Sequence, residues 1–520
     1  MSKSQYPIFN KIPKAKNKKF GNWKLGIGNS TQWCAIINNN CGSALITALV
    51  FLGIFLTLTT ALLSYVQLEV RVSTRSLADS QAIATAEAGI EYYRWHLAHA
   101  PDDFMDGTGT PGTYTHTYRD PQGGIVGTYA LEVTPRNTCN GSVRILSHGT
   151  SAEDPKRTRT VAITYGSPAL TKYSFLTKSN IWFGGGEIKG PIHSNGGIRM
   201  DSDNKSRMTS SKATYICGAE HGCNPARSKP GIWGSGAGGS KGLWDFPADD
   251  VNFETIALNL RTLQQQAIAA NTDFGASGAY GYHAVLQTNG TVLVSRVTDI
   301  YPKVWGYDGR TGWVETAEKI KSEVAVRTLT IPEASVCSTA SLLFFEDTLW
   351  VDGATKQPVT LVAGRFPVDT GDASIIVNGN LTVPASGSAG KIGSIGLIAQ
   401  KDVLIPLESL NTLEIHAALF AQKGHVFRNY YCSDERLNRL YGYKCKSSYN
   451  AFVTRSSLTL KGTVITNQIA AWTWVDQYGN VISGYRGGDN TYETRLIFAP
   501  PPFFPRQGGE RIITWEEINQ

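Results

Sequence analysis

Two cysteine pairs have a spacing that predicts covalent bonds. Cys217 and Cys223 enclose a short Gly-containing loop, and Cys432 and Cys445 bracket a polar, Tyr-rich loop. Cysteines this close in sequence form local disulfides in an oxidising compartment, so we expect both pairs to be bonded. The sequence leaves the pairing of Cys139 and Cys337 open.

Metal binding is the alternative chemistry for the first pair. Cys217, His221 and Cys223 together offer three zinc ligands, but a second ligand pair at conventional spacing is missing. DSDN (201–204) has the clustered oxygens that calcium prefers, yet the remaining ligands of a calcium loop and its later Glu do not follow. We therefore predict no metal site.

Acid–base catalysis on sugars would need two carboxylates about 5–10 Å apart. The acidic residues of the repeated strand region are Asp369, Asp372, Asp402, Glu408 and Glu414. Asp402 falls at a turn position that favours Asn and Asp for backbone reasons. Segment 458–472 contains no acid, so no stacked acidic pair emerges. We expect no catalytic residue and no enzymatic activity.

Other candidate sites are equally sparse. His193 in GPIHSNG (190–196) could bind or catalyse, but a packed or hydrogen-bonded histidine is the more common role. The sequence contains no P-loop, GxSxG, HExxH or GxGxxG motif. We therefore expect no cofactor.

Aromatic residues in Gly-rich or cysteine-bracketed loops form a different kind of candidate. Aromatic faces on rigid loops suit sugar or protein surfaces, and the alternative is packing beneath long loops. The candidates for binding are Trp233, Trp244, Trp305, Trp313, Tyr430 and Tyr431, with Tyr441 and Tyr443 beside them.

The charge distribution indicates a membrane orientation. Residues 1–42 contain seven lysines and no acidic residue, whereas the remainder balances 42 basic against 42 acidic residues. A cationic leader is typical of a cytoplasmic flank. The balanced body lacks the basic character that nucleic-acid binding would need, so we expect no nucleic-acid partner.

An uncharged segment, 44–68, follows the leader and is long enough to span a bilayer. A cleaved secretory signal would have a shorter apolar core. Helical spacing also continues through Val70, Leu77, Ala84, Ala88 and Trp95 without a breaker except Gly89. These features predict one transmembrane and stalk helix over 43–99.

This part of the chain resembles type IV pilins, specifically minor pilins and pseudopilins. The resemblance lies in CGSALITALVFLGIFLTLTTALL and RSLADSQAIATAEAGIEYY. It implies cleavage by a prepilin peptidase after Gly42 and N-methylation of Ser43. The acidic residue usual at the fifth mature position is replaced by Thr47, which fits a tip or initiating position better than the fibre shaft.

Strand patterns fill the rest of the chain. Segments 115–119, 127–135, 142–149 and 157–166 alternate apolar and polar residues, and after a long helix they resemble the antiparallel sheet of a pilin head. Later segments read as strand, turn, strand, and Asn380, Asp402 and Gly424 recur at a spacing of 22. Such a period predicts a parallel β-helix, or solenoid.

The fold class is therefore expected to be α+β, with a mainly β C-terminal region. The expected domains are a leader (1–42), the helix (43–99), a pilin-like sheet (100–168), first β-helix coils (169–214), an insertion domain (215–365), further coils (366–500) with a loop at 429–455, and a tail (501–520).

The predicted function is that of a minor pilin-like subunit in a type IV pilus or pseudopilus, with an adhesive or substrate-contacting region near the fibre tip. Its expected partners are other pilin-like subunits, the prepilin peptidase and a surface glycan or protein. Its expected location is the inner membrane, then an extracellular fibre. The alternative is a membrane-anchored carbohydrate-active β-helix enzyme.

Overall fold

The computed structural model describes residues 41–136, 141–236, 239–309, 311–333, 338–384 and 393–518. The predictions for the leader up to residue 40 and for Cys139 and Cys337 lie outside these residues. The chain divides into two compact units, Met1–Ser76 and Leu77–Gln520, and each is described by itself. The first unit consists, over its described residues, of helix only.

Helix α1 (Cys41–His99) crosses the division between the units. In the second unit, one face of the helix is buried at regular intervals of three or four residues, as a helix packed on a sheet requires. The buried residues on this face are Ala78, Ala82, Ala86, Ile90, Tyr93 and Leu97. Three alanines open this face, so the backbone of the helix can approach the sheet closely.

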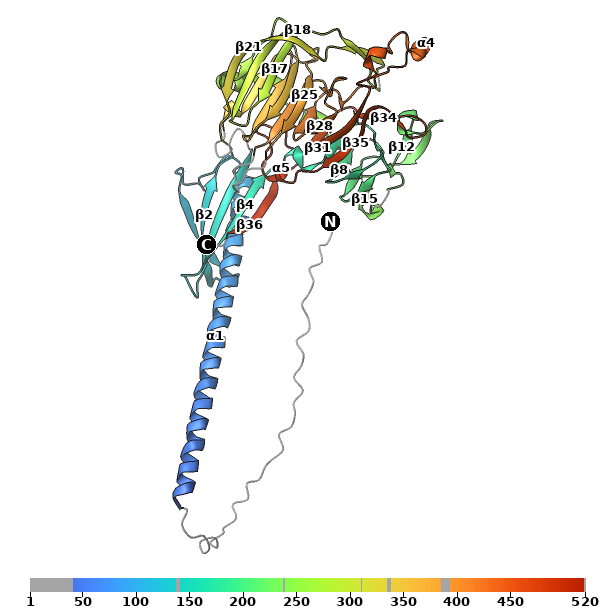
Figure 1. The fold of residues 1–520 in the computed structure, drawn as a ribbon. Helices are drawn as coiled ribbons and strands as arrows, with labels where there is room; N and C mark the ends of the chain where they lie inside the picture. The colour runs from blue at the N-terminus through green and yellow to red at the C-terminus, as the bar shows by residue number, and fades with distance from the viewer. Residues whose placement is uncertain are drawn as a thin grey trace. The chain divides into compact units, whose positions relative to one another are not determined.

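The partner of this face is a five-stranded antiparallel sheet in the order β1-β2-β3-β4-β36 (Figure 1). Its strands are β1 (Thr113–Arg119), β2 (Ile125–Thr134), β3 (Ser142–Ser151), β4 (Thr158–Gly166) and β36 (Arg511–Ile518). The first four match the predicted strands. The fifth comes from the expected tail 501–520, which therefore completes the sheet of the expected region 100–168.

Two larger sheets are built mainly from parallel pairs, and consecutive segments of the chain alternate between them. One sheet has ten strands, in the order β15-β11-β8-β5-β32-β29-β26-β24-β22-β16. These are β15 (Trp244–Asp245), β11 (Met208–Ser210), β8 (Ile192–Ser194), β5 (Phe175–Thr177), β32 (Thr463–Thr466), β29 (Ala418–Ala421), β26 (Ile395–Ala399), β24 (Val359–Ala363), β22 (Leu342–Phe345) and β16 (Asp273–Phe274).

The other large sheet has fourteen strands, and its parallel part continues into the antiparallel strands β17, β18 and β21 (Figure 1). Its strands are β7 (Glu187–Ile188), β10 (Asp203–Asn204), β17 (Gly281–Leu286), β18 (Thr291–Ile300), β21 (Ile320–Thr330), β23 (Leu349–Ala354), β25 (Ile375–Thr382), β27 (Val403–Leu404), β28 (Thr412–Ile415), β30 (Val426–Phe427), β31 (Thr454–Lys461), β33 (Ala470–Ala471), β34 (Thr473–Val475) and β35 (Val481–Thr491).

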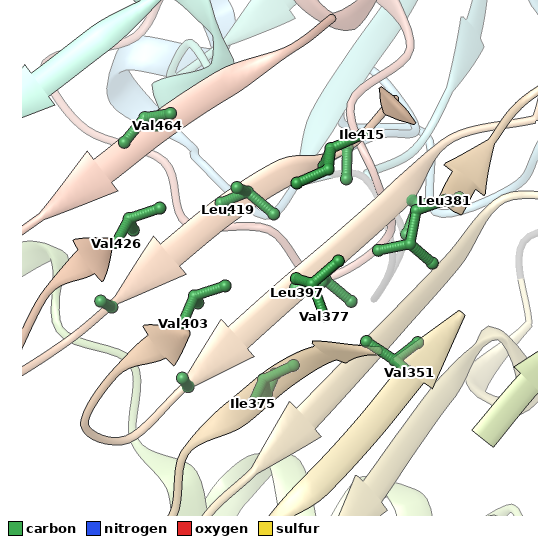
Figure 2. Packing of buried hydrophobic residues seen from close by; sticks show 14 of the residues in the cluster. Val351, Ile375, Val377, Leu381, Leu397, Val403, Ile415, Leu419, Val426 and Val464 are labelled. Carbon is green, nitrogen blue, oxygen red and sulfur yellow. The ribbon is translucent and has the colours of Figure 1, made fainter. Parts of the chain in front are cut away.

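Aliphatic side chains stack in register between the two sheets (Figure 2). In the ten-stranded sheet, Leu361, Leu397 and Leu419 are successive partners, and Val464 follows. The strands are buried on both faces, which explains their uninterrupted apolar runs. The fold is thus α+β with parallel sheets, and the parallel β-helix stays a prediction.

The order of segments along the stack differs from their order in the chain. Strand β32 pairs with β5, so Val464 lies beside Phe175. The expected coils 169–214 and 366–500 therefore join through a contact between distant segments. Strands β22, β23 and β24 lie within the expected insertion 215–365. Strands β22 and β24 belong to the ten-stranded sheet and β23 to the fourteen-stranded sheet. Both sheets therefore continue from residues before 365 to residues after it.

Candidate functional surfaces

The apolar half of α1 is the first candidate surface. Large apolar side chains from Leu45 to Val72 are exposed, and α1 is one helix long and apolar enough to cross a membrane. The hydroxyls of Thr57, Thr60 and Ser64 donate to carbonyls three or four residues earlier in the helix. These polar atoms need no water, so this segment is compatible with lipid.

The expected processing site lies at the beginning of this helix. Gly42 and Ser43 are in the first turn of α1. Thr47, the fifth residue counted from Ser43, is also helical. The cleavage and methylation expected from the pilin resemblance stay predictions.

Both predicted cysteine pairs are disulfides: Cys217 with Cys223, and Cys432 with Cys445. The first disulfide uses both thiolates that the zinc alternative would need. Among the described residues, no group of three or more His, Cys, Asp and Glu side chains could hold a metal ion.

Two of the predicted binding residues serve packing. The guanidinium of Arg199 lies 4.9 Å from the ring of Trp233, whose Nε1 donates to the hydroxyl of Tyr215. The ring of Trp244 packs against the main core, and its Nε1 donates to Asn204 at 3.1 Å. These contacts tie the loop 231–245 to the neighbouring strands.

Other predicted residues come together with two rings that sequence reasoning missed. We define the aromatic surface as Tyr307, Trp313, Tyr430, Tyr441 and Trp474. The centroid of Trp313 is 5.2 Å from that of Tyr441, 6.0 Å from Tyr430 and 6.1 Å from Tyr307. Trp474 lies 6.2 Å from Tyr307 and 6.1 Å from Tyr430. All five rings are partly exposed.

Trp305 and Tyr431 make other contacts. The backbone N–H of Trp305 donates to the hydroxyl of Tyr449, and Lys444 lies 5.3 Å from its ring. Tyr431 is fully buried. Its ring packs under Arg428 and its hydroxyl donates to Glu318. This correction removes Tyr431 from any surface that a ligand could contact.

Four of the five acidic candidates of the repeated region have structural partners. Asp402 accepts from the backbone N–H of His425 at 2.7 Å and contacts its ring, which is a turn role. Asp372 pairs with Arg365, Glu408 with Lys319 and Glu414 with His416.

His193 and the DSDN segment (201–204) are also engaged within the fold. His193 is buried on the outer side of the ten-stranded sheet, where its ring contacts Thr209 at 2.7 Å and Asn195 at 3.0 Å. Asp201 accepts from Trp182 and Arg199. These contacts favour structural roles for both segments.

A histidine between two carboxylates was not anticipated. His283 contacts Glu323 at 2.8 Å through Nδ1 and Asp352 at 3.2 Å through Nε2. Burial alone lowers the pKa of His283, but the hydrogen bond and charge of Asp352, together with Glu323, outweigh it, and the pKa is raised. The three residues come from β17, β21 and β23, so no local motif could have revealed the cluster.

Comparisons with known proteins add little to this geometry. No family model matches the chain, and no curated protein matches it. Among solved structures, the competence-associated pilin ComZ from Thermus thermophilus aligns at 13% identity and a TM-score of 0.27. That alignment covers 85% of this chain and 98% of the ComZ chain. A TM-score this low does not establish a shared fold.

Proposed function

We propose that this protein is a minor pilin-like subunit of a type IV pilus or pseudopilus. One observation carries the proposal. Helix α1 begins as a fully exposed, uncharged apolar segment and ends, within the second unit, as a face of small residues buried on an antiparallel sheet. Residues 41–63 and 75–93 resemble pilins. In such a subunit the first half of the helix resides in the membrane, and the second half attaches the head.

In this proposal the inner membrane holds α1 until assembly. The prepilin peptidase cuts after Gly42, and Ser43 becomes the methylated amino terminus. Other pilin-like subunits then pack against the exposed apolar side chains of residues 44–72, which replaces lipid contacts with helix contacts. The absence of a charge at Thr47 favours a position at or near the fibre tip.

The strand-rich region is the part displayed outside the cell. We propose that the two parallel sheets are faces of a β-helix, whose stacked aliphatic ladder supports loops that contact an adhesive target or substrate. The aromatic surface is the strongest candidate among those loops, because its rings come from three separate segments held in contact.

The amino terminus of the mature protein tests the proposal directly. Mass spectrometry of membrane and sheared-surface fractions from the native host should find N-methyl-Ser43. Gly42→Glu should leave the leader attached and keep the protein out of the sheared fraction, whereas Gly53→Ala is the matched control because its Cβ would meet nothing within 4 Å. An intact leader in the wild-type surface fraction contradicts pilin-like processing.

One observation favours the second candidate function, that of a carbohydrate-active enzyme. Glu323 and Asp352 both contact His283, so two carboxylates and a titratable group are gathered in one place. Release of reducing ends from polysaccharides, lost in Glu323→Gln and Asp352→Asn, would favour this activity over a purely binding role.

A further inference from the structure

The aromatic surface has a fixed arrangement before any ligand arrives. Tyr307 and Tyr430 exchange two backbone hydrogen bonds, of 2.9 and 3.0 Å, which join the hairpin β19–β20 (Val304–Tyr307 and Trp313–Thr316) to the loop after β30. Trp474 of β34 donates through Nε1 to the carbonyl of Arg428 at 2.9 Å. The rings are therefore held by backbone contacts as well as by one another, which reduces the entropy lost on binding.

Four of the five rings carry a polar atom that has no hydrogen-bond partner in the part of the chain that the structure describes. Within the described residues, the hydroxyls of Tyr307, Tyr430 and Tyr441 and the Nε1 of Trp313 have no hydrogen-bond partner, and all four rings are partly exposed. Trp474 differs, because its Nε1 is bonded. A surface that offers ring faces together with free donors and acceptors matches a sugar, which has C–H faces and hydroxyl edges.

Positive charge is concentrated in the loop that carries Tyr430 and Tyr441. Loop 429–455 contains five basic and two acidic residues. Both acids are engaged, since Asp434 pairs with Arg436 and Glu435 accepts from the backbone N–H of Ser447. Arg439, Lys444 and Lys446 form no ion pair within the part of the chain that the structure describes. Arg439 and Tyr441 both belong to helix α4 (Asn438–Tyr441), at the upper right of Figure 1.

We propose that the aromatic surface binds an acidic polysaccharide, with sugar rings on Trp313 and Tyr441 and carboxylates toward Arg439, Lys444 and Lys446. The proposal rests on the pilin-like function above and names the class of its target. An anionic lipid bilayer is the competing partner, because Leu440 and Tyr443 are 76% and 79% exposed beside the same cations. The four unbonded polar ring atoms favour the glycan, since a bilayer interior offers them no partner.

Binding should be measured by titration calorimetry on the full chain held in nanodiscs of neutral phosphatidylcholine. The probes are hexagalacturonate, the neutral cellohexaose, and vesicles that contain phosphatidylglycerol. We expect hexagalacturonate to bind more tightly than cellohexaose and its affinity to fall as salt is added, because the cations and carboxylates are exposed. Vesicle binding that exceeds hexagalacturonate binding, and that is lost in Leu440→Ser, would overturn the proposal in favour of a lipid surface.

Variants distinguish the contribution of the ring contacts to binding from the contribution of the positive charges. Trp313→Ala and Tyr441→Ala should each weaken hexagalacturonate binding roughly tenfold. The matched control Trp515→Ala removes a tryptophan that is 49% exposed on another sheet, and it should bind as the wild type does. The triple change Arg439→Glu, Lys444→Glu and Lys446→Glu should abolish the preference for the acidic sugar while cellohexaose binding persists. Lys356→Glu, at another exposed lysine, should change neither affinity.

Folding and function are checked alongside. A variant is interpreted only where its thermal unfolding midpoint equals that of the wild type, and Tyr441→Ala serves where Trp313→Ala does not fold. Unchanged affinity in a folded Trp313 or Tyr441 variant would overturn the glycan site. N-methyl-Ser43 found together with no glycan binding would reject this site alone, whereas glycan binding by a protein with an uncleaved leader would reject the pilin-like function alone.

Discussion

The hydroxyl of Tyr431 donates a hydrogen bond of 2.7 Å to Oε1 of Glu318, and both side chains are buried. The other carboxylate oxygen of Glu318 accepts from the backbone N–H of Leu407 at 2.7 Å. Burial raises the pKa of Glu318, and these hydrogen bonds only partly oppose the shift. This contact joins the segment just after β20, the strand that contains Trp313, to the loop that bears Tyr430.

Removal of this hydroxyl should cost stability without removing a ring. In Tyr431→Phe, Oε1 of Glu318 loses one donor but still accepts from the hydroxyl of Thr316. We therefore expect a loss of about 1 kcal/mol in the free energy of unfolding. Chemical denaturation monitored by tryptophan fluorescence measures the loss. Tyr443→Phe is the matched control, because that side chain is 79% exposed, and it should unfold as the wild type does. Equal midpoints for all three proteins would mean that the Glu318 contact contributes nothing.

The second prediction concerns pH and His283. The raised pKa of His283 means that its protonated form is favoured in the folded state. Its contribution to stability is therefore complete below the unfolded value of about 6.5 and is lost as pH rises through the folded pKa. We expect the wild type to exceed His283→Gln in thermal stability by more at about pH 6 than at about pH 9.

A second histidine supplies a control of opposite sign. Burial, followed by the charge of Lys461, lowers the pKa of His416. For this group the neutral form is favoured in the folded state, so its contribution to stability grows as pH rises toward 6.5. The difference between wild type and His416→Gln should thus increase with pH where the His283 difference decreases. The same pH trend in both variants would contradict the assigned contacts.

Local pattern predicted the local structure well. The alternation of apolar and polar residues located β1 to β4, because each strand pairs with its neighbour in the sequence. The spacing of cysteines predicted both disulfides for the same reason. The unbroken helical pattern likewise predicted α1, whose burial follows from its own periodicity.

Contacts between distant segments could not be predicted from the sequence, because no local pattern indicates them. Strand β36 pairs with β4 although Thr514 and Thr164 are far apart in the chain. Tyr307 and Trp474 join the aromatic surface from segments that carry no shared motif. Two adjacent tyrosines also differ in burial: Tyr430 is partly exposed, whereas Tyr431 is fully buried. The hydroxyl of Tyr431 contacts Glu318, an acid 113 residues earlier in the chain.

The disulfide that closes the tyrosine loop should matter for both stability and binding. Replacement of Cys432 and Cys445 by serine frees a loop with a sequence separation of 13. We expect a loss of about 2–4 kcal/mol in the free energy of unfolding. Because Tyr441 lies inside this loop, its contact with Trp313 should loosen and hexagalacturonate affinity should fall.

The other disulfide provides the comparison. Serine at Cys217 and Cys223 opens a loop with a separation of only 6, so the entropic loss is smaller, and it leaves the aromatic surface intact. Denaturant midpoints and calorimetry on both double variants test the two parts separately. A larger loss of glycan affinity in the Cys217 and Cys223 variant would contradict the placement of the site.

Helix α1 approaches its sheet closely at Gly149 in β3. A Cβ at this position would lie 2.2 Å from the carbonyl oxygen of Ala82 and 2.3 Å from the backbone nitrogen of Ala86. Both are backbone atoms of a packed helix, so neither can rotate away. Gly149→Ala should therefore push the helix from the sheet and cost about 1–3 kcal/mol of unfolding free energy.

Gly112→Ala is the matched control, since a Cβ there would meet nothing within 4 Å. Hydrogen exchange should show faster exchange in α1 between residues 78 and 97 only in the Gly149 variant, because that face loses its sheet contacts. In the proposed pilin-like subunit, the same variant should reach the membrane and be processed at Gly42, because residues 44–68 are unchanged. The variant should then fail to enter the fibre, because the head is no longer held firmly on the helix. Normal stability and exchange in Gly149→Ala would mean that the helix accommodates the methyl group without shifting, against the packing described.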